Sequence, residues 1–212
     1  MFSVFFTRRR AMRLRIFVDY WNFQLNWNHR SNGSYCDWTR FAPILFQTAQ
    51  AKLQSAGLGQ MTLEETRVYA SYESGRENKL RGWLTDFLDR QPGVRVFQSE
   101  RHWRQKSIHC RSCNNSFEKC PNCSAFFGRA SEKAIDSLIV TDLINLAWEN
   151  AYDVALLVSS DRDFILAIDT LQRKNFKVVN ATWQGHGHEL SRVCWASLSL
   201  DGLIPTLIRQ PT

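Results

Sequence analysis

The sequence predicts an α/β fold in three layers, with a mainly parallel sheet of about five strands and helices on both faces. Short apolar runs alternate with longer stretches in which apolar residues recur at helical spacing. Two of the short runs end on acids, Asp19 near the N-terminus and Asp161 late in the chain. Strands separated by helices need right-handed crossovers, and such crossovers produce a parallel sheet that is covered on both sides.

The composition favours one globular domain that binds an anionic partner. The chain has 212 residues, 44% of them hydrophobic, which is enough for a full core. The net charge of +7 and the pI of about 9.3 indicate a polyanion such as a nucleic acid, with plain solubility as the alternative. No apolar run approaches the roughly 20 residues that span a bilayer, so we expect no membrane partner and a cytoplasmic location.

The first half of the chain is expected to alternate strand and helix. Helical spacing of apolar residues such as Leu80, Trp83 and Leu84 favours a helix there. Gly57 ends one predicted helix, and Pro92 and Gly93 end the next. The expected elements are a strand at 13–19, a polar and aromatic loop at 20–36, a helix at 39–55, a strand at 66–72, a helix at 76–90 and a strand at 94–98.

The second half contains a basic, cysteine-rich insertion at about 101–130 and then resumes the alternation. The run with Ile135, Leu138 and Ile139 has the broad apolar face of a core helix. Residues 1–11 precede a second Met and are expected to form a disordered basic arm before a domain at 12–212. The remaining expected elements are a helix at 131–150, a strand at 154–158, a helix at 164–174, a strand at 177–181 and a helix or short strand within 189–209.

Four acids from three distant segments are candidate ligands of a divalent cation. Two predicted strands end on acids, and parallel strands deliver such side chains to one edge of the sheet. Crowded carboxylates repel unless a cation neutralises them, and their hard oxygens suit Mg²⁺ or Mn²⁺. Asn22 follows on the adjoining turn and is expected to orient a ligand or the scissile phosphate. The alternative is that the later acids only cap the next helix. The candidate ligands are Asp19, Asp136, Asp161 and Asp163.

Three motifs resemble the NYN-domain proteins of the PIN-like nuclease superfamily, including the LabA-like branch. Residues 17–22 resemble their opening strand, 133–136 their Lys-Gly-Val-Asp helix start, and 159–164 their Ser-Gly-Asp-Ser-Asp-Phe motif. The resemblance covers about residues 13–183, with the motifs in the family's order. It implies a PIN-like α/β/α sandwich and Mg²⁺- or Mn²⁺-dependent RNA cleavage. The acids that match the family's acids are Asp19, Asp136, Asp161 and Asp163.

Some residues depart from the family pattern. Ala134 and Ser160 replace glycines, and Arg162 replaces a small residue between two acids. Arg162 is expected either to bind phosphate or to form an ion pair that competes with metal, so a catalytically weak RNA-binding or regulatory module stays open. A HAD-type phosphatase is disfavoured because Trp21 stands where that class has a second Asp. Asp142 also matches a family acid but lies about 120° round the helix from the other one.

The insertion carries two Cys-x2-Cys knuckles that are typical of a structural zinc site. Four thiolates complete a tetrahedral shell around Zn²⁺ and leave no open position for catalysis. Redox cysteines or an iron–sulfur cluster are the alternatives. Similar zinc-ribbon insertions occur in some LabA-like proteins at this place in the chain. The proposed zinc ligands are Cys110, Cys113, Cys120 and Cys123.

Basic and aromatic residues interleave at the start of the insertion. Cations follow a phosphate backbone while aromatic rings stack on unpaired bases, as in single-strand binding. The alternative is that the rings pack the insertion against the domain. The sequence therefore predicts a metal-dependent ribonuclease for single-stranded or loop RNA, with homo-oligomerisation left open. The expected RNA contacts are Arg162, Arg101, Trp103, Arg104 and Lys106.

Overall fold

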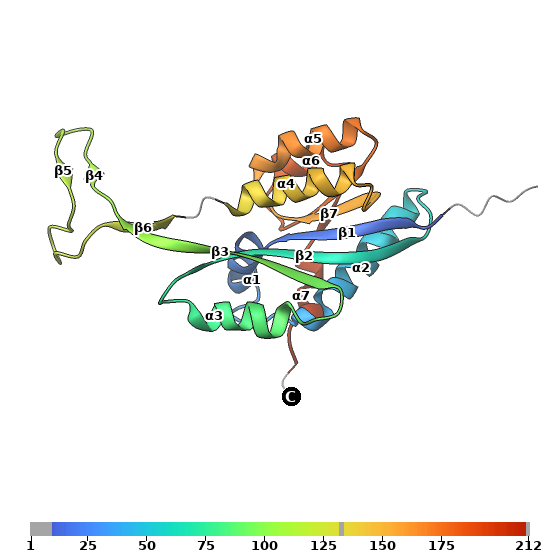
Figure 1. Ribbon diagram of the computed structural model, residues 1–212, viewed down its shortest axis with the longest axis horizontal. Helices are drawn as coiled ribbons and strands as arrows, with labels where there is room; N and C mark the ends of the chain where they lie inside the picture. The colour runs from blue at the N-terminus through green and yellow to red at the C-terminus, as the bar shows by residue number, and fades with distance from the viewer. Residues whose placement is uncertain (1–9, 132–133, 211–212) are drawn as a thin grey trace, which may run out of the picture.

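The computed structural model describes residues 10–131 and 134–210 and contains one main sheet with helices on both faces (Figure 1). Six of its strands are parallel, and β6 pairs antiparallel with β3 at one edge. The predicted three-layer α/β fold is confirmed, with one parallel strand more than expected. The seven strands lie in the order β6 (Gly128–Ser131), β3 (Val94–Gln105), β2 (Met61–Glu73), β1 (Met12–Asp19), β7 (Val154–Val158), β8 (Lys177–Thr182) and β9 (Ala196–Ser199).

Helices form the two outer layers, and each layer encloses its own hydrophobic core. One core gathers Phe17, Tyr152 and Phe164 beneath the helices drawn above the sheet in Figure 1. The other gathers Trp27 and Trp183 on the opposite face. The first layer contains α4 (Ile135–Trp148), α5 (Ile165–Arg173) and α6 (His188–Val193), and the second contains α1 (Tyr20–Arg30), α2 (Trp38–Ser55), α3 (Asn78–Trp83) and α7 (Ile204–Leu207).

The strand order places a topological switch point between the carboxyl ends of β1 and β7, which is called the crevice below. From β1 the chain proceeds outward through β2 to β3, and from β7 it proceeds outward in the other direction through β8 to β9. The direction of winding therefore reverses between two neighbouring strands. Ligands of open α/β sheets bind at the carboxyl ends of the strands that flank such a reversal. Asp19 and Ser159 lie at these two strand ends.

The expectation of a loop at 20–36 is wrong for its first part, because Tyr20–Arg30 form helix α1. The Asp19 carboxylate caps this helix by accepting a hydrogen bond from the Asn22 backbone N–H at 3.2 Å. Phe23 and Trp27, one turn apart, stack at 5.7 Å and are buried. Aromatic and Asn residues have low helix propensity, so tertiary packing decides this element.

Several predicted boundaries also shift. The helix expected from residue 131 begins at Ile135, because Ser131 still belongs to β6. The helix expected at 76–90 is α3 followed by a π-helical turn at Leu84–Leu88. The tail contributes α6, β9 and α7. Residues 1–9, which belong to the predicted N-terminal basic segment, and Lys133 of the second motif lie outside the described residues.

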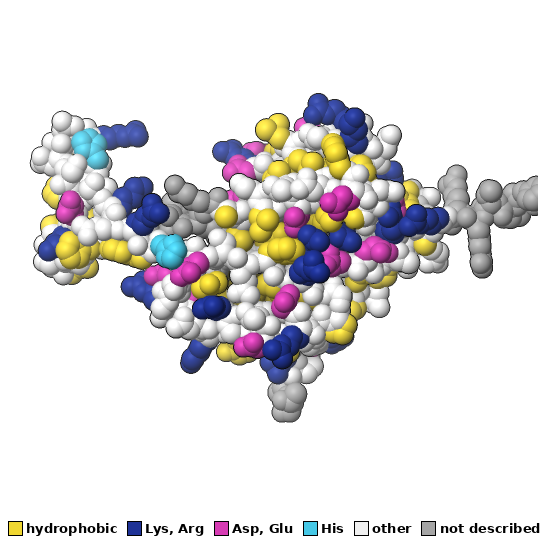
Figure 2. Space-filling view, viewed as in Figure 1, with side chains coloured by type: hydrophobic (Ala, Val, Ile, Leu, Met, Phe, Trp, Pro, Cys, Tyr) yellow, Lys and Arg dark blue, Asp and Glu magenta, His cyan; other side chains and the backbone are white. Residues whose placement is uncertain are grey.

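Residues 102–131 form a projecting arm built on β3. The end of β3 pairs with β6 from His102 to Gln105, and the tip carries the two-residue strands β4 (Ile108–His109) and β5 (Ser116–Phe117). Figure 2 shows this arm standing away from the body of the protein with Lys and Arg side chains on it. Within the described ranges, no helix is both long and apolar enough to cross a membrane.

Truncating Phe23 should unfold the protein far more readily than truncating its neighbour Leu25 does. Phe23 is 1% exposed and contacts the rings of Trp27, Trp38, Phe41 and Trp183. Phe23→Ala should cost about 3–5 kcal/mol in the free energy of unfolding, measured by urea denaturation. Leu25→Ala is the matched control on the same helix, since Leu25 is 61% exposed and should change stability by about 0.5 kcal/mol or less. Similar losses in both variants would contradict this helix and its orientation.

Candidate active site

Asp19 is a buried carboxylate at the reversal point of the sheet. Its side chain is buried and accepts hydrogen bonds from the Asn22 N–H and, at 3.0 Å, from the Ser159 hydroxyl. Burial, helped by the charges of the nearby carboxylates Asp136 and Asp161, raises its pKa to about 7, although the two hydrogen bonds act in the opposite direction. The surroundings of Asp19 therefore disfavour its charged form.

The turn after β7 brings two more acids to the same crevice. The Ser159 hydroxyl that donates to Asp19 also accepts the Asp161 N–H at 3.1 Å. One Asp161 oxygen accepts the Asp163 N–H at 3.0 Å and so caps the short helix η2 (Arg162–Phe164). The capping role is thus real, and it occupies one of the two carboxylate oxygens. Asp163 itself is exposed.

Asp136 reaches the same place from the first turn of α4. Partial burial raises its pKa, and the charges of Asp161 and Asp163 raise it further. The four predicted acids therefore share one electronegative crevice, and their hard oxygens suit Mg²⁺ or Mn²⁺. Across the described parts of the chain, no three His, Cys, Asp or Glu side chains lie close enough together to form a ready-made metal shell.

Asn22 fastens α1 to the turn after β7. Its side-chain oxygen accepts the Ser160 N–H at 2.9 Å, so the amide holds the segment that carries Asp161. The Asn22 backbone N–H also donates to the Asp19 carboxylate, which caps α1. The sequence predicts that Asn22 orients a ligand or the scissile phosphate, whereas its side chain positions the turn that carries Asp161.

Sequence reasoning missed the polar residues that support the acids from below. Asn180 donates to the Ser159 carbonyl at 2.8 Å and accepts the Ser191 hydroxyl at 2.7 Å. Thr182 and Ser160 share a hydroxyl hydrogen bond of 2.7 Å. A signal existed, because Asn180 and Thr182 are polar residues within the buried, mostly apolar part of β8 that follows Lys177. Gly187 is required here because its φ is +66° and a Cβ would lie 2.7 Å from the Thr182 hydroxyl.

Arg162 is in ion-pair contact with an acid of α6. Its guanidinium lies 3.8 Å from the Glu189 carboxylate on α6, and both side chains are exposed. An exposed pair of this kind contributes at most about 1 kcal/mol and exchanges readily with solvent. The expected ion pair that competes with metal is not among the ion pairs of the described residues, because the partner of Arg162 is Glu189.

The expected RNA contacts divide into engaged and free side chains. Arg101 forms a 2.6 Å ion pair with Glu77 and lies over the Trp21 ring at 4.9 Å. The Trp103 ring covers Gly128, where a Cβ would lie 1.9 Å from it, so this ring packs within the arm. Arg104 and Lys106 are exposed on the arm.

The Asp142 carboxylate links α4 to β2 through hydrogen bonds. One of its oxygens accepts the Arg67 guanidinium and the Tyr69 hydroxyl, each at 2.7 Å. Arg67 is buried, so this pair satisfies a charge that would otherwise be costly. Asp142 therefore has a role in stability that its match to a family acid does not reveal.

The two cysteine knuckles have matching local geometry. Backbone hydrogen bonds within the first knuckle lower the pKa of Cys110, and those within the second lower the pKa of Cys120. Asn114 and Ser124, each following the second cysteine, both adopt positive φ. The two pairs are not assembled into one four-thiol cluster in the described chain.

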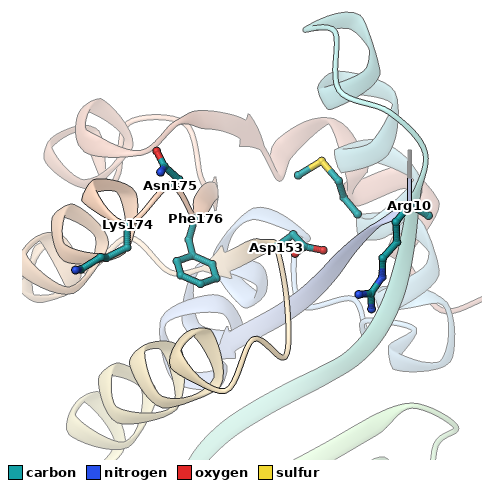
Figure 3. Close-up of a pocket in the computed structure, with 7 residues that line it drawn as sticks. Arg10, Asp153, Lys174, Asn175 and Phe176 are labelled. Carbon is teal, nitrogen blue, oxygen red and sulfur yellow. The ribbon is translucent and has the colours of Figure 1, made fainter. Parts of the chain in front are cut away.

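A cavity of about 340 Å³ lies at the opposite edge of the sheet (Figure 3). It is lined by residues that precede β1, β7 and β8, among them Arg10, Asp153 and Phe176. The Asp153 carboxylate is held by Arg13 at 3.0 Å. This cavity is therefore remote from the acidic crevice at the carboxyl ends of the strands.

Comparisons with known proteins agree with this architecture. The model of the NYN domain family matches residues 13–201, so the chain belongs to that family, whose fold is that of PIN-like nucleases. A crystal structure of a protein of unknown function from Vibrio parahaemolyticus RIMD 2210633 aligns with a TM-score of 0.55 at 18% identity, over 94% of this chain and 96% of that one. Identity this low supports the fold alone. No curated protein matches the chain.

Asp19→Asn should stabilise the metal-free protein at neutral and higher pH. The raised pKa means that the folded state binds a proton more tightly than the unfolded state. The stability that protonated Asp19 provides is complete below about pH 4 and is lost as pH rises to about 7, by up to about 1.4 kcal/mol per pH unit. Urea denaturation at pH 5 and pH 8 should show a smaller decline in the Asn variant. An equal decline in both proteins would refute the burial of this carboxylate.

Proposed function

We propose that this protein is a metal-dependent ribonuclease that hydrolyses single-stranded or loop RNA. The observation that carries the proposal is the convergence of Asp19, Asp136, Asp161 and Asp163 at the reversal point of an NYN-domain sheet. Repulsion among these carboxylates favours binding of a divalent cation. The net charge of +7 matches a polyanionic substrate.

The carboxylates would hold Mg²⁺ or Mn²⁺ through oxygens that are not used in capping. A bound divalent cation lowers the pKa of water and neutralises charge on a phosphodiester. The protein supplies the arrangement: Ser159 fixes the spacing of Asp19 and Asp161, and Asn22 fixes the turn through the Ser160 N–H. These neutral hydrogen bonds hold acids together that would otherwise separate.

The arm supports the choice of a flexible RNA strand as substrate. Arg104 and Lys106 are exposed on a two-stranded ribbon that extends β3 beyond the carboxyl edge of the sheet, where the acids lie. Exposed cations on a projecting ribbon can follow a backbone that bends toward the crevice. Single-stranded RNA bends in this way at low cost, whereas a duplex is stiff.

The rival is a module of the same fold that binds RNA without efficient turnover. Its main motivation is Arg162, a cation between two candidate ligands. The contact of Arg162 with Glu189 weighs against this rival, because that contact directs the guanidinium toward α6. The rival module is still supported by Ala134 and Ser160, which replace two glycines of the family pattern.

Asp163→Asn should abolish divalent-cation-dependent cleavage of a labelled single-stranded RNA while the protein stays folded. Asp163 is exposed, so the substitution removes a candidate ligand without opening the core. Loss of one ligand that acts on the reaction should reduce kcat by about 100-fold or more. Gel analysis of cleavage with Mg²⁺, Mn²⁺ or chelator measures the effect.

Asp86→Asn is the matched control, because Asp86 is 71% exposed and pairs only loosely with Arg90 at 3.9 Å. It should cleave at the wild-type rate. Wild-type activity in Asp163→Asn would remove this residue from the site. RNA binding by the wild type without any metal-stimulated cleavage would favour the rival module.

We further propose that the arm binds one structural Zn²⁺ through Cys110, Cys113, Cys120 and Cys123. The matching knuckles and the lowered pKa values of Cys110 and Cys120 support thiolate ligation. The two pairs would close around the ion as the tip of the arm folds.

Elemental analysis of protein purified without chelator should find about one zinc per chain. Cys113→Ser should lose the zinc and weaken RNA binding more than it lowers the cleavage rate at saturating RNA, since the arm is separate from the acids. Cys194→Ser is the control, because Cys194 lies outside the arm, and it should keep the zinc. Iron with visible absorbance, or no metal in the wild type, would overturn the zinc site.

A further inference from the structure

An aromatic groove lies between α1, α2, α3 and the C-terminal segment, on the face of the sheet away from α4. Two adjoining cavities of about 300 and 470 Å³ form it, and they share Cys36, Trp38, Trp83 and Arg209 in their walls. None of the motifs that define the acidic crevice includes these residues. The groove is therefore a separate feature of the fold that needs its own account.

Stacked rings form one wall of this groove. Tyr20 stacks on Trp38 at 5.7 Å, and Trp83 meets Trp38 edge-on at 5.8 Å. Phe87 continues the row by stacking on Trp83 at 5.8 Å. Tyr35 lines the smaller cavity and is 82% exposed. A planar ligand that enters this groove meets the exposed rings of Tyr35 and Phe87 and the half-buried ring of Trp83. Tyr20 and Trp38 are buried and support these rings through the contacts given above.

The rim of the groove is cationic. Lys79, Arg40 and Arg209 line it, are exposed, and form no ion pair within the described residues. Asp37 is the one acid in the described lining, and its carboxylate accepts the Thr39 N–H at 3.1 Å. An aromatic floor with a positive rim complements stacked bases that are joined by phosphates.

The groove is tied to the acidic crevice by helix α1. Tyr20 directly follows Asp19, so one residue step separates the groove wall from the buried carboxylate. Lys79 lies at the start of α3, which follows the carboxyl end of β2. The far side is fixed by a backbone bond from the Arg209 N–H to the Tyr35 carbonyl at 2.8 Å. The groove thus opens beside the same edge of the sheet as the acids.

We propose that this groove is a base-binding subsite for single-stranded RNA, which rests on the ribonuclease function proposed above. One unpaired base stacks on the exposed Tyr35 ring and packs against the half-buried Trp83 ring, while Lys79 and Arg209 contact the flanking phosphates. The subsite holds the strand next to Asp19 without contact with the acids. RNA must therefore contain unpaired bases to bind tightly at this subsite.

Affinity for a fluorescent single-stranded oligoribonucleotide, measured by anisotropy without added divalent cation, tests the subsite apart from cleavage. Tyr35→Ala should weaken binding about tenfold, and Tyr35→Phe should keep the affinity because the ring remains. Lys79→Ala should weaken binding and reduce the slope of log K against log salt by about 0.7. Both residues are exposed, so neither change should affect folding.

Two variants at the opposite edge of the sheet are matched controls for ring and charge. Trp148 is 54% exposed at the end of α4, and Lys174 lines the cavity of Figure 3. Trp148→Ala and Lys174→Ala should bind RNA like the wild type. Equal weakening in these controls would show a general loss of affinity and overturn the subsite.

The outcomes separate the subsite from the proposed activity. Metal-dependent cleavage by the wild type together with unchanged affinity in Tyr35→Ala and Lys79→Ala would overturn the subsite and leave the function intact. A wild type that neither binds nor cleaves RNA would overturn both. A change of oligomeric state in Tyr35→Ala with unchanged RNA affinity would identify the groove as a contact between copies and also overturn it. Photocrosslinks from 4-thiouridine RNA to peptides that contain Tyr35 or Trp83 would support it directly.

Discussion

The hydroxyl of Ser159 is the contact on which the arrangement of the crevice depends. It donates to Asp19 at the end of β1 and accepts from the backbone of Asp161 after β7, so a single side chain spans the reversal point. Asn180 holds the Ser159 carbonyl from the next strand. Acids that repel one another are kept within reach by neutral hydrogen bonds, which do not add to the charge of the crevice.

This arrangement costs stability, and the packing around it supplies the compensation. Asp19 is buried near other carboxylates, and burial raises its pKa to about 7, so the fold disfavours the charged form. Apolar cores on both faces of the sheet fix β1 and β7 regardless of that penalty. Polar residues that work against folding are typical of functional sites, because selection for stability alone would replace them.

Sequence patterns predicted most of the sheet, because strand runs are local signals. Asp19 and Asp161 stand where apolar strand runs end, and Asp136 lies in the first turn of an apolar helix. The loop predicted in place of α1 is wrong, because Asp19 both caps the helix and is a candidate metal ligand, and because aromatic residues carry the apolar spacing of the helix. The support from Asn180 and Ser191 joins residues eleven positions apart across a strand and a helix, and it depends on tertiary pairing that no local pattern encodes. The placement of Arg162 against Glu189 is of the same kind.

A chain of contacts connects the base of the arm to the aromatic groove. Arg101, where β3 leaves the main sheet, lies over the Trp21 ring at 4.9 Å, and Trp21 meets Tyr20 edge-on at 5.3 Å. Tyr20 forms the groove wall and adjoins Asp19, so the arm, the groove and the crevice share the first turn of α1. An RNA strand held by the arm cations at one end and by the groove at the other would pass this turn. Its backbone would then lie beside the acids, because the helix that Asp19 caps is the element common to all three features.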